Sequence, residues 1–568
     1  MASRQAWSMR SIPTLLRHDL VAGMTLAAYA VPDSLAYATL AGLPPQVGLY
    51  GYMAGGLGYA LVGSSRYIAV GPTSAISLMI GVTAAGMANG DPDRYLRIAV
   101  TTAIVVAVLC LIGWLLRLSV LVKLISDSAL IGFKAGAGLT IAITQIPALL
   151  GIPDLPAQAV GGMLAAGGHS APELLVRVLS RAGQANPATC VFGALAFLLL
   201  ALGHRCWPGR PVALAVVAAA TAASALFGLS RYGIAVTGPI PGGLPGPTWP
   251  ATDWQAYRQV LPLATGCLLL AYIEGVAAAR AFALKHDEYV DPRRELLGLG
   301  AANLATGLVG GYPVAGGLSQ TAVNEQAGAR SRLSLVFASV TLSLALLFLT
   351  GLLASLPRSV LAAVVLVTVL GLFDLRAIRH MEAVSRVDLL HAAAAFGGVL
   401  LLGILPGILL AVVVSMAQVL FRYSTPHVAF LGRIRGTQQF SDLRDHPENE
   451  RLPDILAVRP EASLLYLNAD HVLASVLGRL DRQQAGTVKA VVCDLSASPR
   501  MDLAGARMLT ELQQRLQARG VRLLVADALS PVRALLRAQG LEPRIEGVTD
   551  RLSLADAVAS AEATGHGH

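Results

Sequence analysis

Long apolar stretches follow one another almost without interruption from about residue 19 to residue 422. A helix needs about 20 apolar residues to cross the ~30 Å hydrocarbon core of a bilayer. Segments such as 102–116, 334–354 and 395–421 are near that length, and we count about fourteen of them. Only 14% of the residues are charged, against about 25% in soluble domains. The sequence therefore predicts an α-helical polytopic membrane protein and excludes an ordinary soluble enzyme.

The composition changes abruptly after residue 441, where charged and polar residues return between short apolar runs. We expect a cytoplasmic N-terminal segment at 1–18, fourteen transmembrane helices at 19–424, a linker at 425–440, a soluble domain at 441–560 and a disordered tail at 561–568. Within the soluble domain, 463–467, 488–495 and 521–526 are predicted strands, and 503–518 and 531–539 are predicted helices. Such alternation is typical of a small α/β layer.

The distribution of lysine and arginine predicts the orientation. With fourteen spans and a cytoplasmic N-terminus, 16 of these residues before the soluble domain lie on the cytoplasmic side and 7 on the other. The positive-inside rule favours this arrangement, so we expect a multi-pass protein of the inner (plasma) membrane with both termini in the cytoplasm. No cleavage site follows the first apolar stretch, which should remain as a span. The net charge of +9 is scattered along the chain, so no nucleic acid partner is expected.

An internal repeat indicates a transporter. Shifting the chain by 247 residues places 51–76 on 298–323, with seven identities in 26 positions. Seven spans is an odd number, so the two copies would have opposite orientations, as in the inverted repeats of secondary transporters. A shared glycine- and alanine-rich composition is the alternative explanation.

Both copies of the repeat end in a break, at 70–74 and at 316–321. We expect each break to be extended backbone that leads into a short helix in the middle of the membrane. The free N–H groups at such a helix start are tolerated only where they line a cavity or meet an anion. Two facing starts predict a small-anion site with Thr73, Ser74, Ser319 and Gln320 as neutral donors beside Gly317. The alternative is that the glycines only allow kinks between close-packed helices.

Two carboxyl groups fall inside predicted spans, Asp33 and Glu274. A charged residue in a membrane span is costly and is a functional candidate, and both groups could carry a proton. The structural alternatives are a pair of Glu274 with Arg280 and a helix-start role for Asp33 after its preceding proline. Lys134 lies near the start of its span and is expected to extend towards the membrane surface.

Four blocks of sequence resemble the sulfate permease (SulP) family of anion transporters. They are DLVAG at 19–23, VPDSLAYATLAGLPPQVGLYG at 31–51, GSSRYIAVGPTSAISLM at 63–79 and RELLGLGAANLATGLVGGYPVAGGLSQTAVNEQAGARS at 294–331. The resemblance covers nearly the whole chain. It implies fourteen spans in a 7+7 inverted repeat, a gate domain that moves against a core domain, a substrate site between the broken third and tenth helices, a cytoplasmic STAS domain and a homodimer.

The resemblance also assigns individual residues. It places substrate positions on Asp33 and Tyr37 in the first span, on Thr73 at the third helix and on Ser319 and Gln320 at the tenth, and it places the acidic residue of the eighth span on Glu274. Members that transport sulfate usually have glutamine at the position of Asp33 and arginine at that of Gln320. This chain is therefore up to two charge units less favourable to a dianion, and protonation of Asp33 would restore one unit. A monoanion or a dicarboxylate competes with sulfate as substrate.

The soluble domain departs from the phosphorylated relatives of the STAS fold. Ala504 stands before Gly505, where anti-sigma-factor antagonists have a phosphorylatable serine, so a phosphorylation switch is not expected there. A structural role for this domain is as plausible as a regulatory one.

We therefore expect a secondary transporter of a small anion, of the sulfate type, that works by alternating access with proton coupling. Succinate- or fumarate-like dicarboxylates and bicarbonate are alternative substrates. A nucleobase permease of the same 7+7 architecture would lack the soluble domain, and an anion channel or a membrane-anchored regulator is the alternative of another class. Expected partners are the anion, protons and membrane lipid. No enzyme motif, catalytic residue, cofactor or metal site is expected, and the five cysteines are isolated.

Overall fold

The computed structural model describes residues 12–88, 91–117, 126–152, 171–207, 212–239, 241–248, 254–483, 487–549 and 551–565. The expected cytoplasmic segment up to residue 11 and the last three residues of the expected tail lie outside these ranges. The chain divides into two compact units, Met1–Ser415 and Met416–His568, which we describe one at a time.

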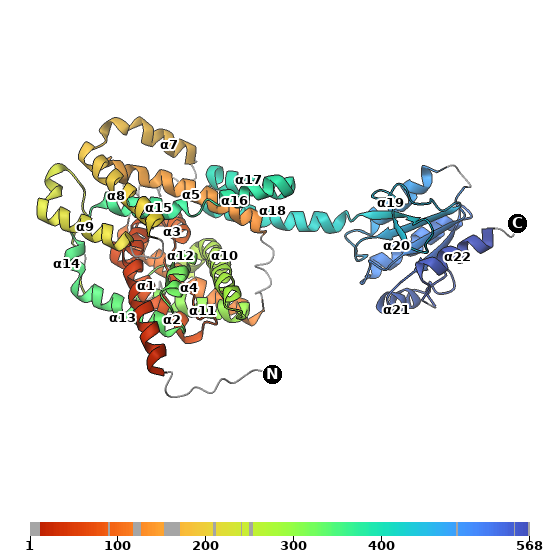
Figure 1. Cartoon of the computed structure of the whole chain (residues 1–568), viewed down its shortest axis with the longest axis horizontal. Helices are drawn as coiled ribbons and strands as arrows, with labels where there is room; N and C mark the ends of the chain where they lie inside the picture. The colour runs from red at the N-terminus through yellow and green to blue at the C-terminus, as the bar shows by residue number, and fades with distance from the viewer. Residues whose placement is uncertain are drawn as a thin grey trace. The chain divides into compact units, whose positions relative to one another are not determined.

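The first unit is built from helices (Figure 1). In chain order these are α1 (Ile12–Leu40), α2 (Pro45–Val62), α3 (Ser74–Ala88), α4 (Pro92–Leu115), α5 (Asp127–Leu150), α7 (Ala171–Ser180), α8 (Pro187–Cys206), α9 (Val212–Phe227), α10 (Trp254–Lys285), α11 (Pro292–Leu308), α12 (Leu318–Gln326), α13 (Leu333–Phe348), α14 (Thr350–Leu353), α15 (Arg358–Leu370), α16 (Leu375–Val384), α17 (Arg386–Leu402) and α18 (Ile404–Ser424).

The helices form two groups by their contacts. In the first group, α11 packs on α2 and α4, and α1 packs on α2, α12 and α13. In the second group, α5 packs on α15 and α17, and α8 packs on α15. The helix α1 also contacts α15, so it lies where the two groups meet.

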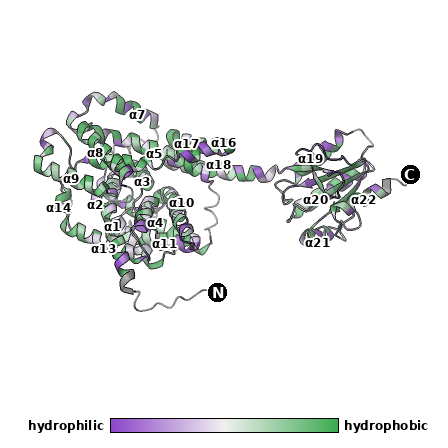
Figure 2. Cartoon of the chain, in the orientation of Figure 1, coloured by the Kyte–Doolittle hydropathy of each residue, from purple (hydrophilic) through white to green (hydrophobic). Residues whose placement is uncertain are grey.

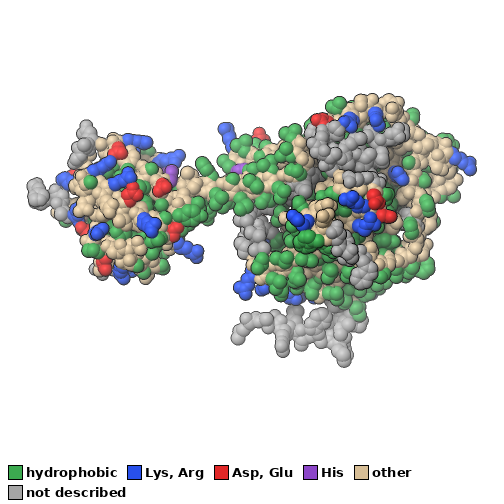
Figure 3. Space-filling view, turned by 180° about the vertical axis from the view of Figure 1, so that it is seen from behind, with side chains coloured by type: hydrophobic (Ala, Val, Ile, Leu, Met, Phe, Trp, Pro, Cys, Tyr) green, Lys and Arg blue, Asp and Glu red, His purple; other side chains and the backbone are tan. Residues whose placement is uncertain are grey.

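The surface of this unit is apolar, as a bilayer requires. Five helices in the described part of the chain are long and apolar enough to cross a membrane, and hydrophobic residues dominate the unit in Figure 2. Large apolar side chains such as Val191, Leu226 and Phe348 are exposed, at 70%, 81% and 75%. Figure 3 shows hydrophobic side chains over much of its visible face. Lipid, rather than water, explains so much exposed apolar surface.

Two of the long apolar stretches are broken in the structure. The stretch 334–354 forms α13 and the short α14, and the stretch 395–421 is divided between α17 and α18. The second break is at Gly403, which has φ +95°, a backbone conformation that ends helices and favours glycine. Beyond the turn, Gly398 and Gly407 let α17 and α18 pack closely, because a Cβ on Gly407 would lie 2.7 Å from Val399 Cα.

The second unit is a five-stranded sheet with helices, an α/β layer as expected (Figure 1). The strand order is β4 (Phe440–Asp442), β3 (Val428–Arg433), β5 (Ile455–Pro460), β6 (Ala490–Asp494) and β7 (Arg522–Ala526). The strands β5, β6 and β7 are parallel, and β3 is antiparallel to both its neighbours. The helices are α19 (Ala469–Asp481), α20 (Leu503–Gln517), α21 (Ser530–Ala538) and α22 (Leu554–Gly565).

The predicted strand at 463–467 is wrong. Only an isolated bridge from Leu464 to Met501 forms in this segment of the described chain. The reason is Asn468, whose side chain accepts the Leu465 N–H at 2.9 Å and donates to the Ser463 carbonyl at 3.0 Å, which folds the segment into a turn before α19. The strand β3 lies within the segment 425–440 expected as a linker, and α22 extends to Gly565, into the expected tail.

Candidate functional site

A short antiparallel pair of strands joins the two breaks of the repeat. The strand β1 (Val70–Gly71) pairs with β2 (Ala315–Gly316), with Val70 opposite Gly316. The Gly317 N–H donates to the Ala69 carbonyl at 3.1 Å, which extends the pairing by one residue. Each strand leads directly into a helix, β1 into α3 and β2 into α12. The pair therefore holds the N-terminal ends of two helices beside each other.

Both helix starts present backbone donors. The first N–H groups of any helix lack an intrahelical acceptor and carry the positive end of the helix dipole. In α12 the N-cap residue is Gly317, which has no side chain to accept from these groups. In α3 the first turn closes with a hydrogen bond of 2.9 Å from the Ser77 N–H to the Thr73 carbonyl. Such paired starts favour an anionic ligand.

Gln320 bridges the two halves of the site. Its side chain is buried at 2% exposure, and its Nε2 donates to the Pro72 carbonyl at 3.2 Å, from the first turn of α12 to the residue before Thr73. The Gln320 Oε1 has no hydrogen-bond partner. A Cβ on Gly317 would lie only 2.8 Å from this oxygen, so glycine is needed at the N-cap for the amide to lie across it.

A first polar cluster joins α1 to α12. Asp33 is 2% exposed and lies in the middle of α1, so it is not a helix-start carboxylate. Tyr29, one turn earlier, interacts with the Asp33 carboxyl and with the Ser319 hydroxyl. Tyr37, one turn later, is 3% exposed and interacts with Thr368 of α15. One face of α1 thus carries three polar side chains to the start of α12 and to the second helical group.

A second polar cluster joins α3, α5 and α10. Glu274 lies near the Thr73 hydroxyl at the start of α3 without a hydrogen bond to it, and the positive charge of Lys134 from α5 acts on it electrostatically. The charged neighbour of Glu274 is therefore Lys134, not Arg280. Lys134 is partly buried in α5, and its expected extension to the membrane surface stays a prediction.

Several polar atoms in these clusters are buried without a protein partner. They are Asp33 Oδ2, Thr73 Oγ1 and Gln320 Oε1. Nearly all buried polar atoms in proteins are hydrogen-bonded, so a group of exceptions needs an explanation. Thr73 and Gln320 lie at the two helix starts, and Asp33 is linked to the start of α12 through Tyr29 and Ser319.

The structure brings most of the expected site residues together. Asp33 and Ser319 share the first cluster, Thr73 and Glu274 the second, and Gln320 and Gly317 lie between the two helix starts. Ser74 is the first residue of α3 and is 6% exposed. Sequence reasoning missed Tyr29, although a tyrosine four residues before a membrane carboxyl lies on the same helix face.

Comparison with known proteins identifies the family of the chain. The model of the sulfate permease family matches residues 16–395, and that of the STAS domain matches residues 446–561. A probable sulfate transporter of Mycobacterium tuberculosis is 34% identical over 93% of this chain and 92% of its own length. A probable sulfate transporter of Arabidopsis thaliana is 29% identical over 96% of this chain and 88% of its own length.

Solved structures share the fold at low sequence identity. The murine Solute Carrier 26 family member A9 anion transporter, in the inward-facing state, has a TM-score of 0.86 at 20% identity and covers 99% of this chain and 96% of its own. The transmembrane domain of a cyanobacterium bicarbonate transporter, BicA, has a TM-score of 0.58 at 22% identity and covers 72% of this chain and 98% of its own.

These similar proteins are transporters, in agreement with the expectation that the chain is not an enzyme. The helical membrane unit, the α/β unit after it and the two family matches lead to one conclusion. The chain belongs to the sulfate permease family and carries a C-terminal STAS domain.

Proposed function

We propose that this protein is a secondary active transporter of a small anion that works by alternating access. The observation that carries the proposal is the β1–β2 pair, which holds the N-terminal ends of α3 and α12 beside buried polar atoms that lack partners. Helix starts of this kind replace the hydration shell of an anion without a full opposite charge. The names of the similar proteins, which are sulfate and bicarbonate transporters, support the same class of substrate.

We further propose fourteen spans in a 7+7 inverted repeat. The first repeat comprises α1–α5, α8 and α9, and the second comprises α10–α13, α15, α17 and α18. The group of α1–α4 and α10–α13 is the core domain, which carries the site, and the remaining helices are the gate domain. The gate contacts the site through α1 and α15, where Tyr37 interacts with Thr368. Movement at this contact would expose the site to each side of the membrane in turn.

Proton coupling is proposed from the two membrane carboxyls. Asp33 and Glu274 each lie in a polar cluster that includes one of the two helix starts. A carboxylate there repels an anion, and a protonated carboxyl does not, so proton and anion would bind together. Binding of both on the same side would make uptake of the anion draw on the proton gradient.

Uptake by the purified protein in proteoliposomes tests the function. We expect saturable uptake of radiolabelled sulfate, accelerated by an inward proton gradient, and competition by one or more of bicarbonate, nitrate, succinate and fumarate. The competitor with the lowest inhibition constant identifies the substrate class. Flux that cannot run against a concentration gradient would indicate a channel, and no flux for any of these anions would leave only a role as membrane-anchored STAS regulator.

The charge of the site is expected to set the preference between dianions and monoanions. Asp33→Gln combined with Gln320→Arg makes the site up to two units more positive. One charge pair at 4 Å is worth about 1 kcal/mol even at the dielectric constant of water. We therefore expect the ratio of sulfate to nitrate uptake to rise by at least about tenfold.

The matched control is Gln326→Arg, the same substitution at an exposed position at the end of α12. The control should leave the sulfate-to-nitrate ratio near that of the unmodified protein. An unchanged ratio in the double variant would mean that Asp33 and Gln320 do not face the substrate.

The natural cysteines provide a test of the proposed orientation. Cys206 is exposed at the end of α8, which the proposed topology places on the cytoplasmic side, whereas Cys110, Cys267 and Cys493 are buried. Cys190, near the other end of α8, is partly buried and donates to the Leu150 carbonyl at 3.4 Å, so it should label more slowly than Cys206. In the STAS domain, burial and the neighbouring Asp494 carboxylate raise the pKa of the Cys493 thiol to about 12, which makes it slow to react. We expect a membrane-impermeant maleimide to label inside-out vesicles but not intact cells.

Replacement of Cys206 by serine should remove this labelling. Labelling of intact cells that disappears in the Cys206→Ser variant would reverse the proposed orientation. The STAS domain would then also lie outside, because it follows the last span.

We expect the protein to form a homodimer, as the family resemblance implies.

A further inference from the structure

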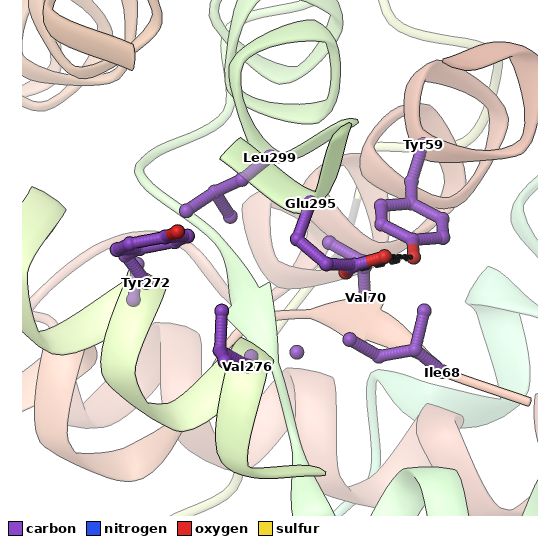
Figure 4. A pocket seen from close by; sticks show the side chains of 10 residues that line it. Tyr59, Ile68, Val70, Tyr272, Val276, Glu295 and Leu299 are labelled. Atoms are coloured by element: carbon purple, nitrogen blue, oxygen red, sulfur yellow. Dashed lines mark hydrogen bonds between the residues drawn. The ribbon is translucent and has the colours of Figure 1, made fainter. Parts of the chain in front are cut away.

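A buried carboxylate outside the two polar clusters holds the turn that leads into β1. Glu295 lies in the first turn of α11 and is 3% exposed. Figure 4 shows its side chain directed at the hydroxyl of Tyr59, from α2. Neither residue interacts with Asp33 or with Glu274 in any contact described above. The role of Glu295 must therefore come from the groups that it binds.

The Glu295 carboxylate accepts hydrogen bonds from four donor groups, and the Tyr59 hydroxyl is shared between its two oxygens. The Tyr59 hydroxyl lies 2.7 Å from Oε1 and 2.9 Å from Oε2. The Ser64 hydroxyl at 2.5 Å, the Ser64 N–H at 3.1 Å and the Ser65 N–H at 3.0 Å all meet Oε1. No lysine or arginine forms an ion pair with Glu295 among the salt bridges of the described residues. Hydrogen-bond donors stabilise the negative charge, which makes each of these bonds charge-assisted.

The same turn continues into the site. The Ser65 hydroxyl oxygen accepts from the N–H groups of Tyr67 and Ile68, both at 3.3 Å. Two residues later Val70 begins β1, and the Ala69 N–H donates to the Thr321 hydroxyl of α12 at 3.1 Å. Hydrogen bonds thus run from Glu295 through Ser65 to Ile68, two residues before the strand that precedes α3.

The packing between Glu295 and the strand pair is tight. A cavity of only about 10 Å³ lies there, lined by Tyr59, Glu295, Ile68, Val70, Gly275 and Gly316 among others (Figure 4). This volume admits about one water molecule. On the strand side, a Cβ on Gly316 would lie 2.9 Å from Gly275 Cα. Closely packed interiors transmit small displacements, so a shift of the turn would move β1.

We propose that Glu295 is a positioning residue for the anion site, because its charge fixes the turn before β1 and through it the start of α3. The expected effect of Glu295 on transport rests on the proposed function. Its effect on the position of the turn and of β1 does not. Glu295 itself does not touch the anion. Its effect on the anion passes through Ser64, Ser65 and β1.

The test is Glu295→Gln, which keeps the size of the side chain and replaces one acceptor oxygen by an NH₂ donor. At least one donor of the turn is then left without an acceptor in a buried place. We expect the KM for sulfate to rise by about tenfold, with little change in the maximal rate per folded transporter. We also expect faster hydrogen–deuterium exchange of the amides of residues 64–76. Tyr59→Phe should also raise the KM when made in the unmodified protein. We expect a smaller rise when it is added to Glu295→Gln, because the two side chains share one network.

Asp19→Asn is the matched control. Asp19 is also a fully buried carboxylate that forms no ion pair with another described residue, and it accepts from the Arg330 N–H at 2.7 Å, the Ser331 N–H at 3.0 Å and the Ser331 hydroxyl. It holds the connection after α12, at the end of that helix away from the site. We expect Asp19→Asn to lower the melting temperature but to leave the KM unchanged. Exchange of residues 64–76 should rise less than in Glu295→Gln, because Asp19 reaches this turn only through Arg332, the residue after Ser331, which donates to the Gly63 carbonyl at 2.6 Å.

Two outcomes would overturn the proposal. One is unchanged exchange of residues 64–76 in Glu295→Gln, whatever the transport assay gives. The other is a lower melting temperature with an unchanged KM, which would show a structural role only. If the unmodified protein transports none of the anions tested, the proposed function fails, and the exchange measurement still decides whether Glu295 positions β1.

Discussion

Replacement of Glu274 by glutamine should abolish accumulation of the anion under a pH gradient and leave exchange of anion for anion intact. Glutamine resembles the protonated carboxyl in size and charge and keeps a polar side chain near the Thr73 hydroxyl, its neighbour in the second cluster. The substituted transporter would thus always be in the state that binds the anion. One coupled proton and a gradient of one pH unit are worth about tenfold accumulation. We expect that accumulation in the unmodified protein and none in Glu274→Gln.

The measurement is uptake of labelled anion into proteoliposomes, with and without a pH gradient, beside exchange at equal pH. Glu288→Gln is the control, because Glu288 forms a partly exposed salt bridge with Arg66 at 3.2 Å, and such pairs contribute little. The control should keep its accumulation. Full accumulation by Glu274→Gln would assign coupling to Asp33 alone or remove protons from the mechanism.

Replacement of Gly316 by valine should lower uptake by about fivefold or more. A Cβ at this position would lie 2.4 Å from Ile68 Cδ1 and 2.9 Å from Gly275 Cα. Overpacking of this kind costs about 1–3 kcal/mol, which corresponds to about a fivefold to hundredfold change in an equilibrium constant. The added side chain would displace the β1–β2 pair and therefore change the distance between the two helix starts. Uptake per folded molecule and the melting temperature are the quantities to measure.

Gly397→Val is the matched control for Gly316→Val. Gly397 lies in α17, and a Cβ there meets no other atom within 4 Å. Uptake by this variant should equal that of the unmodified protein. If Gly316→Val transports normally, the strand pair does not set the geometry of the site.

Much of the site could be predicted from the sequence because its residues lie in recognisable local sequence patterns. Apolar stretches predict spans, and a Gly-Pro-Thr-Ser or Gly-Leu-Ser-Gln segment between them predicts a helix that starts inside the membrane. These patterns place Thr73, Ser319 and Gln320 at helix starts without any tertiary information. A carboxyl in an apolar span stands out for the same reason, as Asp33 and Glu274 do.

The remaining features depend on contacts between distant segments. The neighbour of Glu274 is Lys134, which is 140 positions earlier in the chain, and no spacing rule connects them. Glu295 is near the start of a helix, where acidic residues are common for reasons of the helix dipole, so its contact with Ser64 is invisible in the sequence. The turn at 463–467 was missed because its apolar residues match a strand, while a single hydrogen-bonding side chain, Asn468, determines the backbone.

The central claim is that an anion binds between the starts of α3 and α12. Diffraction from crystals grown with selenate, at the selenium absorption edge, tests this claim directly because selenate closely resembles sulfate. We expect an anomalous peak beside Thr73, Ser319 and Gln320, within hydrogen-bonding distance of the first N–H groups of both helices. A peak elsewhere in the membrane unit, with none at the helix starts in crystals of a preparation that transports sulfate, would contradict the account.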